Sequence, residues 1–231
     1  RAELISLLKK EFKVDPDKGA HARFLSLEMI WPNNALLRAY VLSPRLGQIS
    51  ADLLDVPAVR LYHDNVLAKQ AGCGRTPWHF DDHHFPLDTN DVVTAWVPAQ
   101  PIPLEMGPLT FAYPLDVHEL VNAVTFEKTG TGYDRGVSDV FSKNNVSINE
   151  TPFELGEVSF HHNLNFHTAS SNRTNRSRVA LANTYYRDGA RVVNAPTMVS
   201  GDWQKFMPNV KPGDVAASPL NPICWPIKDK S

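Results

Sequence analysis

The spacing of hydrophobic and polar positions changes after the first quarter of the chain. In the stretch AELISLLKKEF, apolar residues recur every three or four positions, as Leu4, Leu7, Leu8 and Phe12 do. Such spacing gives a helix one apolar face. Two later stretches, NNALLRAYVLS and SPRLGQISADLL, begin with residues that cap helices or occupy their first turn. The pattern therefore predicts a helical N-terminal part over residues 1–56.

Residues 57–190 carry short apolar segments instead, rich in β-branched and aromatic residues and bounded by Gly, Pro, Asn or Asp. This texture is typical of strands, and no segment is followed by a helical crossover. The pattern favours a mainly β protein with flanking helices, built as an antiparallel barrel or a double-sheet jelly roll. We expect one domain over 1–231, with residues 191–231 as a C-terminal extension. The expected strands are VRLYHDNVLAK, DVVTAWVPA, GPLTFAYP, GEVSFHHNLNFH and SRVALANTYYRD.

One polar stretch, residues 115–150, interrupts the strand pattern and contains the sequence KTGTGYDRG. A connection of this length often forms a lid or a binding loop. We therefore expect it to contribute to a substrate pocket.

Composition narrows the possible partners. The 231 residues include 21% charged residues and a formal net charge of −2, which gives no reason to expect nucleic acid or an anionic membrane. No run of 18 apolar residues is present, so no membrane span is expected. Two cysteines are too few for a disulfide framework, which favours a reducing, cytoplasmic location. The chain opens without an initiator Met, so we expect residues to precede Arg1.

The densest chemistry lies in TPWHFDDHHFPLDT, where His79 and Asp81 form an H-x-D pair. In a strand, residues two apart point to the same face, so both side chains can converge on one point. A third ligand must come from elsewhere, and GEVSFHHNLNFH offers His161, His162 and His167. Two histidines and one carboxylate are the facial triad of non-haem Fe(II) oxygenases. Taken alone, an H-x-D pair is weak evidence for such a site.

Arg178 strengthens this interpretation. It follows His167 by eleven residues, across the turn-rich stretch TASSNRTNRS, so an antiparallel return would bring the two side by side. Its planar guanidinium can bind a dicarboxylate through two hydrogen bonds. An iron site beside a carboxylate clamp points to 2-oxoglutarate as co-substrate.

With these motifs in this order, the sequence resembles the phytanoyl-CoA dioxygenase family of Fe(II)- and 2-oxoglutarate-dependent oxygenases. The similarity runs from about Arg38 to Arg178 and includes YHDNVLAK, WHFDDHHFPL, VVTAWVPA and MGPLTFAYP. The resemblance implies a double-stranded β-helix (jelly-roll, cupin-like) core. It also implies a dioxygenase that uses Fe(II), 2-oxoglutarate and O2 to hydroxylate a small organic molecule, releasing succinate and CO2. The implied iron ligands are His79, Asp81 and His167, and the implied 2-oxoglutarate contacts are Arg178, Trp96, Asn65 and, from the helical region, Arg23.

Two positions depart from the family pattern. Phe80 stands between the first two ligands, where Gln is frequent, and Ala169 replaces a Ser two residues after the distal His. Thr168 or Ser170 could supply the missing hydroxyl, and the sequence does not choose between them. Asp81 itself favours hydroxylation over halogenation, because related halogenases have Ala or Gly there.

Other residues receive separate predictions. At the mouth of the site we expect substrate contacts from His83, His84 and Phe85, supported by the 115–150 segment, Tyr186 and Arg187. Structural roles are expected for His161, His162 and His118, and a solvated or loop-fixing role for Lys69. Two other functions stay open: a non-catalytic metal-binding jelly-roll module, and a cupin-type dioxygenase that needs no 2-oxoglutarate. The oligomeric state and the substrate, whether a CoA thioester or a free small molecule, are also open.

Overall fold

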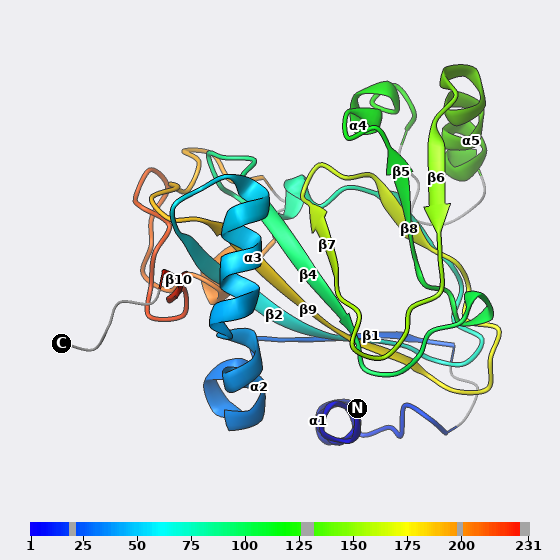
Figure 1. Cartoon of the computed structure of the whole chain (residues 1–231), viewed down its shortest axis with the longest axis horizontal. Coiled ribbons are helices and arrows are strands. Elements are labelled where there is room, and N and C mark those ends of the chain that lie inside the picture. The colour runs from blue at the N-terminus through cyan, green and yellow to red at the C-terminus, as the bar shows by residue number, and fades with distance from the viewer. Residues whose placement is uncertain (19–21, 126–131, 198–200, 227–231) are drawn as a thin grey trace.

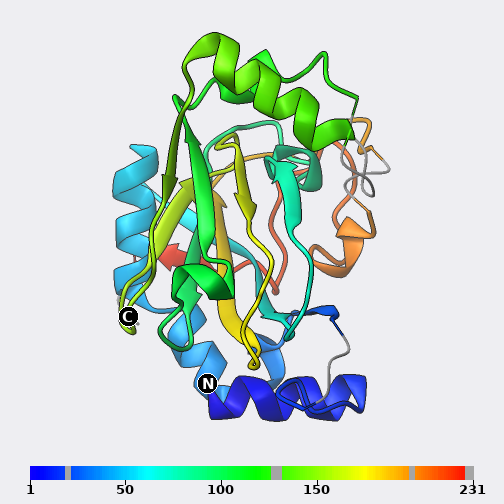
Figure 2. The same ribbon diagram turned by 90° about the vertical axis from the view of Figure 1, so that its right-hand side faces the viewer.

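Two antiparallel sheets face each other and enclose the interior of the protein, with helices on the outside (Figures 1 and 2). The computed structural model describes residues 1–18, 22–125, 132–197 and 201–226. Within these ranges no helix is long and apolar enough to cross a membrane.

The larger sheet has the strand order β1-β2-β9-β4-β7, and β10 pairs with β2. Its long central strand, β9, pairs with β2 on one side and β4 on the other, so nearly all its residues are buried. Side chains alternate along these strands, one set facing the helices and the other facing the second sheet. The strands are β1 (Phe24–Glu28), β2 (Val59–Lys69), β4 (Val92–Pro98), β7 (Ser159–His162), β9 (Arg178–Arg187) and β10 (Ile223–Trp225).

The smaller sheet has the order β3-β8-β5-β6 and lies on the right in Figure 1. Its strands are short: β3 (Thr76–His79), β5 (Leu109–Tyr113), β6 (Ser147–Glu150) and β8 (His167–Ala169). Just before β5, Gly107 adopts a positive φ of 73°, and a Cβ there would lie 2.1 Å from the carbonyl oxygen of Ser170, which follows β8. Only glycine fits this approach of two chain segments.

The three N-terminal helices are α1 (Ala2–Phe12), α2 (Ala35–Val41) and α3 (Pro44–Leu54). As the sequence predicts, Asn34 caps α2 by accepting a hydrogen bond from the Leu37 amide, and Pro44 opens α3. Ser43 precedes α3 but makes no side-chain cap bond. Helix α3 crosses the outer face of the larger sheet, and the main hydrophobic core lies between the two (Figure 1).

Two expectations about secondary structure need correction. The N-terminal part is not wholly helical, because β1 pairs with β2 along its full length and extends the larger sheet. Its apolar positions are too few to reveal a five-residue edge strand. The 115–150 stretch is not a plain connection either: its described residues form α4 (Val117–Leu120), α5 (Gly132–Asn144) and β6. Residues 126–131 of this stretch lie outside the described ranges.

Helix α5 packs on the outer face of the smaller sheet rather than over the interior (Figure 2). Its Phe141 contacts Trp78 of β3 edge to face, with ring centroids 5.0 Å apart. On its other side Trp78 stacks on Phe166, at 5.6 Å and an interplanar angle of 8°. This aromatic cluster fixes the strand that precedes the H-x-D pair.

Candidate functional site

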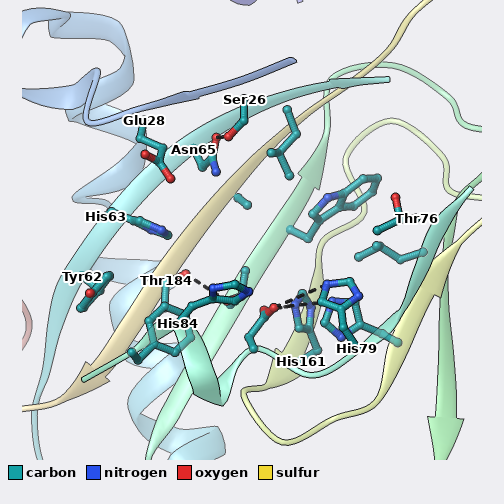
Figure 3. A pocket seen from close by; sticks show the side chains of 18 of the residues that line it. Ser26, Glu28, Tyr62, His63, Asn65, Thr76, His79, His84, His161 and Thr184 are labelled. Atoms are coloured by element: carbon teal, nitrogen blue, oxygen red, sulfur yellow. Dashed lines mark hydrogen bonds and ion pairs between the residues drawn. The ribbon is translucent and has the colours of Figure 1, made fainter. Parts of the chain in front are cut away.

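The two sheets enclose a cavity of about 640 Å³, part of which Figure 3 shows with His79 labelled. Asp81 and Arg178 also line this cavity. One wall comes from β1, β2, β4, β7 and β9 of the larger sheet, and the facing wall from β3, β5 and β8 of the smaller one. Its polar lining residues are Ser26, Glu28, Tyr62, His63, Asn65, Thr76, His79, Asp81, His84, Thr94, Trp96, His161, His167, Thr168, Arg178, Thr184, Asp202 and Lys205.

The structure brings together the three predicted metal ligands, His79, Asp81 and His167, with their ligand atoms within 4.8 Å of one another. His79 ends β3 and lies directly opposite His167 in β8, so strand pairing places the two rings side by side. Their centroids are 4.2 Å apart. The Oδ1 atom of Asp81 lies 3.7 Å from Nε2 of His79 and 3.9 Å from Nε2 of His167. One ion could contact all three atoms.

Backbone carbonyls orient both imidazoles. Nδ1 of His79 lies 2.8 Å from the Pro77 oxygen, and Nδ1 of His167 lies 2.9 Å from the Asn165 oxygen. Because a carbonyl oxygen can only accept, Nδ1 must carry the hydrogen in each ring, which leaves the Nε2 lone pair free toward the cluster. Burial and the nearby His79 lower the pKa of His167 to about 3, so this ring is neutral, the form that binds metals.

Asp81 reaches the cluster by a different route from the one the sequence predicts. Strand β3 ends at His79, and Asp81 has helical backbone angles at the start of a short 3-10 turn, Asp82–His84. Its amide donates to the Asn163 oxygen at 2.8 Å, which fixes this turn. Burial alone would raise the pKa of Asp81, but the imidazoles around it outweigh that effect and lower it, so the carboxylate is ionised. The turn, rather than strand alternation, makes the H-x-D pair converge.

At one end of the cavity, Arg178 forms a buried positive charge beside Trp96. Arg178 is 2% exposed, and the central carbon of its guanidinium lies 5.3 Å from the Trp96 ring centroid. Nη1 donates to the Gly107 oxygen at 2.6 Å, whereas Nε is buried without a partner among the described residues. Burial lowers the pKa of Arg178 to about 10, which keeps it charged at neutral pH. A buried cation with unused donors is suited to an anion from the cavity.

The other residues expected near 2-oxoglutarate differ in position. Asn65 lines the cavity and accepts a hydrogen bond from Ser26 at 2.9 Å (Figure 3). Arg23 is exposed just before β1 and is not among the cavity-lining residues. Lys69 is fully buried rather than solvated, and its Nζ donates to the carbonyls of Ala169 and Ser170, so it fixes a loop. Burial and the adjacent Arg178 lower the pKa of Lys69 to about 7.

Three hydroxyl groups lie near Ala169, the position where the family usually has Ser. Thr168 lines the cavity, but its hydroxyl already bonds to the Thr76 carbonyl and to Arg75. The hydroxyl of Ser170 donates to Glu150 at 2.9 Å, outside the main cavity. Thr76 pairs directly with Ala169 across the strands, lines the cavity and is a hydroxyl donor that sequence reasoning missed (Figure 3).

Phe80, the residue between the first two expected ligands, belongs to an aromatic cluster outside the cavity. Its ring packs against His83 at 4.4 Å and His118 at 5.2 Å, and the residue is not among those that line the cavity. Phe80 directly follows His79 at the end of β3, and its ring and that of His83 lie together outside the cavity. His118 belongs to this outer cluster, in line with its expected structural role.

Of the three residues expected to contact the substrate, His84 and Phe85 line the cavity and His83 does not. Tyr186 and Arg187 point elsewhere: the Tyr186 hydroxyl donates to the Ala216 carbonyl, and Arg187 is paired with Asp91 at 3.4 Å. None of the described residues of the 115–150 segment lines the cavity.

The C-terminal extension lines the cavity instead, through Gly201, Asp202, Lys205 and Phe206. Nζ of Lys205 lies 2.7 Å from Oε2 of Glu28 in β1. No sequence motif distinguishes this contact, which joins residues 177 positions apart.

Comparison with known proteins identifies a family that matches most of the chain. The family model described as phytanoyl-CoA dioxygenase (PhyH) matches residues 13–180. No curated protein sequence matches the chain.

Among solved structures, the chain is similar to the non-haem alpha-ketoglutarate-dependent carbocyclase SnoK from nogalamycin biosynthesis, with 22% identity and a TM-score of 0.72 over 96% of this chain and 87% of that chain. It is similar to the epimerase SnoN in complex with Fe3+, alpha ketoglutarate and nogalamycin RO, with 20% identity and a TM-score of 0.69 over 96% and 88%. It is also similar to EctD from S. alaskensis with 2-oxoglutarate and 5-hydroxyectoine, with 16% identity and a TM-score of 0.62 over 95% and 81%. The expected jelly-roll core with flanking helices is confirmed.

Proposed function

We propose that this chain, a member of the phytanoyl-CoA dioxygenase family of Fe(II)- and 2-oxoglutarate-dependent oxygenases, hydroxylates a small organic molecule. In this reaction it releases succinate and CO2. One observation carries the proposal: the three-ligand cluster and the buried guanidinium of Arg178 line a single cavity. Three protein ligands leave coordination positions open, as a catalytic metal needs, whereas a structural zinc site is closed by four. A dioxygenase without 2-oxoglutarate would leave Arg178 buried with unused donors.

The residues that line the cavity have different proposed roles: some bind the metal and others bind the co-substrate. When bound, Fe(II) and 2-oxoglutarate supply the oxidising chemistry, in which O2 is consumed, the co-substrate becomes succinate and CO2, and a substrate C–H becomes C–OH. We assign His79, Asp81 and His167 to the metal and Arg178 to the distal carboxylate of the co-substrate. Trp96, beneath the guanidinium, excludes water from that contact, which strengthens a charge-assisted hydrogen bond.

The opposite end of the cavity is the proposed substrate site. His84 and Phe85 reach it from the turn after the metal ligands, and His63 points into it from β2 (Figure 3). Glu28 and Lys205 add opposite charges near the surface, and both are partly exposed. Aromatic rings with a few polar groups are suited to a small polar or amphipathic molecule rather than to a bare hydrocarbon chain.

Two measurements test the proposal. The anaerobic protein given Fe(II) should develop a weak visible absorption when 2-oxoglutarate is added, and His167→Ala should abolish it. His118→Ala, which removes a histidine outside the cavity, is the matched control and should leave the absorption unchanged. If the wild type develops no absorption, or if His167→Ala keeps it, the proposed function is wrong.

A metabolite library would then be screened for succinate release above the rate without substrate. The mass of the product identifies the reaction: hydroxylation adds one oxygen atom, ring closure removes two hydrogen atoms, and epimerisation leaves the mass unchanged. We expect the gain of one oxygen. If a substrate is consumed without that gain, the reaction is another oxidative one of this family and the proposed hydroxylation is wrong.

A further inference from the structure

A third imidazole, that of His161, lies against the metal cluster from the larger sheet. Strand β7 pairs with β4, and this register places His161 opposite Thr94 with its ring in the cavity (Figure 3). The residue is 6% exposed, and its ring centroid lies 4.8 Å from that of His167. Its neighbour His162 is half-buried, does not line the cavity, and accepts a hydrogen bond from the Leu164 amide. The purely structural role that the sequence suggests for both therefore describes His162 better than His161.

The two oxygens of Asp81 face different partners. Oδ1 is the atom that approaches Nε2 of both His79 and His167, whereas Oδ2 lies 3.6 Å from Nε2 of His161. We infer that His161 is a positioning residue, whose Nε2–H holds Oδ2 of Asp81 so that only Oδ1 is presented to the metal. This inference rests on the proposed metal site and assigns His161 no contact with the metal itself.

The surroundings of the three rings support one tautomer for His79 and His167, with the hydrogen on Nδ1, and the other for His161, with the hydrogen on Nε2. Nδ1 of His79 and of His167 each faces a carbonyl oxygen, so in both rings Nε2 keeps its lone pair. No such carbonyl faces His161, whose Nδ1 is buried without a partner among the described residues. A carboxylate oxygen only accepts hydrogen bonds, and no carbonyl draws the hydrogen of His161 to Nδ1, so a hydrogen on Nε2 is the arrangement in which the ring faces Oδ2 favourably. That nitrogen then has no lone pair for a metal.

Such a contact affects how many coordination positions remain open. A carboxylate that binds through both oxygens occupies two positions, and one that binds through a single oxygen occupies one. Holding Oδ2 away from the metal therefore keeps a position free for the co-substrate or O2. Partners of this kind also orient the ligand, and their loss commonly weakens metal binding by about 10- to 100-fold.

Two substitutions at His161 separate its possible roles. In His161→Gln the amide NH2 can replace Nε2–H, whereas His161→Leu has similar bulk and no donor. We would measure anaerobic Fe(II) affinity and the visible absorption of the Fe(II)–2-oxoglutarate complex for each variant. We expect His161→Leu to bind Fe(II) at least about tenfold more weakly and to lose the wild-type spectrum, and His161→Gln to restore both. His162→Leu, on the same strand but outside the cavity, should match the wild type.

Wild-type affinity and spectrum in His161→Leu would overturn the inference. Equal weakening of His161→Gln and His161→Leu would overturn it too, because the imidazole lone pair itself would then be required, as in a fourth ligand. Should His161→Leu fail to fold, His161→Asn keeps a polar side chain that is too short to reach Oδ2 and takes its place in the comparison. A wild type that forms no Fe(II)–2-oxoglutarate complex would instead refute the proposed function, so the two failures are distinguishable.

Discussion

Replacing Arg178 by lysine keeps the buried positive charge and removes the planar fork. In the structure one arm, Nη1, is used by the Gly107 carbonyl, and the remaining donors are available to a carboxylate from the cavity. A hydrogen bond to a charged group contributes about 1.5–3 kcal/mol, so losing one of two such bonds should cost at least about 1.4 kcal/mol. That corresponds to roughly a tenfold rise in the apparent 2-oxoglutarate constant. Arg178→Ala removes the charge as well and should raise the constant further.

The assay is succinate formation at varied 2-oxoglutarate concentrations, with Fe(II) held constant. A matched control is Arg187→Lys, at the other end of β9, where the side chain is partly exposed and paired with Asp91. This control should keep the wild-type constant. Unchanged constants for both Arg178→Lys and Arg178→Ala would refute the carboxylate clamp, whatever the variants do to the maximal rate.

Two further predictions concern the turn after the ligands and the strand before them. His84→Ala should lower substrate turnover while succinate formation without substrate survives, and His83→Ala should lower neither, because only His84 lines the cavity; equal losses in both variants would contradict this division. Trp78→Ala should lower the free energy of unfolding by about 3–5 kcal/mol, because it removes a buried indole packed between Phe141 and Phe166. Urea unfolding measures this change, and a loss below about 1 kcal/mol would mean that the cluster does not hold α5 on the sheet.

Much of the candidate site could be predicted from short stretches of the sequence. The pair of His79 and Asp81 is separated by one residue, and His167 and Arg178 by a short turn, so backbone geometry alone limits how far apart each pair can lie. The types of side chain are also informative together. Two imidazoles and a carboxylate can bind a metal, and a guanidinium beside them can bind the carboxylate of a co-substrate. For this reason His79, Asp81 and Arg178 could be named before the fold was known, whereas the choice of His167 over His161 and His162 came from the family resemblance.

The same local reasoning failed where a turn replaced a strand. Strand alternation predicts that His83 shares a face with the ligands, but β3 ends at His79 and a 3-10 turn follows. Asp81 still converges with His79, because the amide of Asp81 is fixed by Asn163 from a distant part of the chain. A bond between residues so far apart leaves no trace in the spacing of polar and apolar positions.

The sequence by itself determined the chemistry of the cluster, the mainly β pattern and the helices before it, because these depend on residue type and on neighbours within a few positions. Tertiary structure alone decided which histidine of the pair at 161 and 162 faces the cluster, since that follows from the register of β7 on β4. It also decided that Lys205 of the C-terminal extension meets Glu28 and lines the cavity, which none of the described residues of the 115–150 segment does. Strand register and the packing of distant segments minimise the free energy of the whole molecule, so no local stretch specifies them.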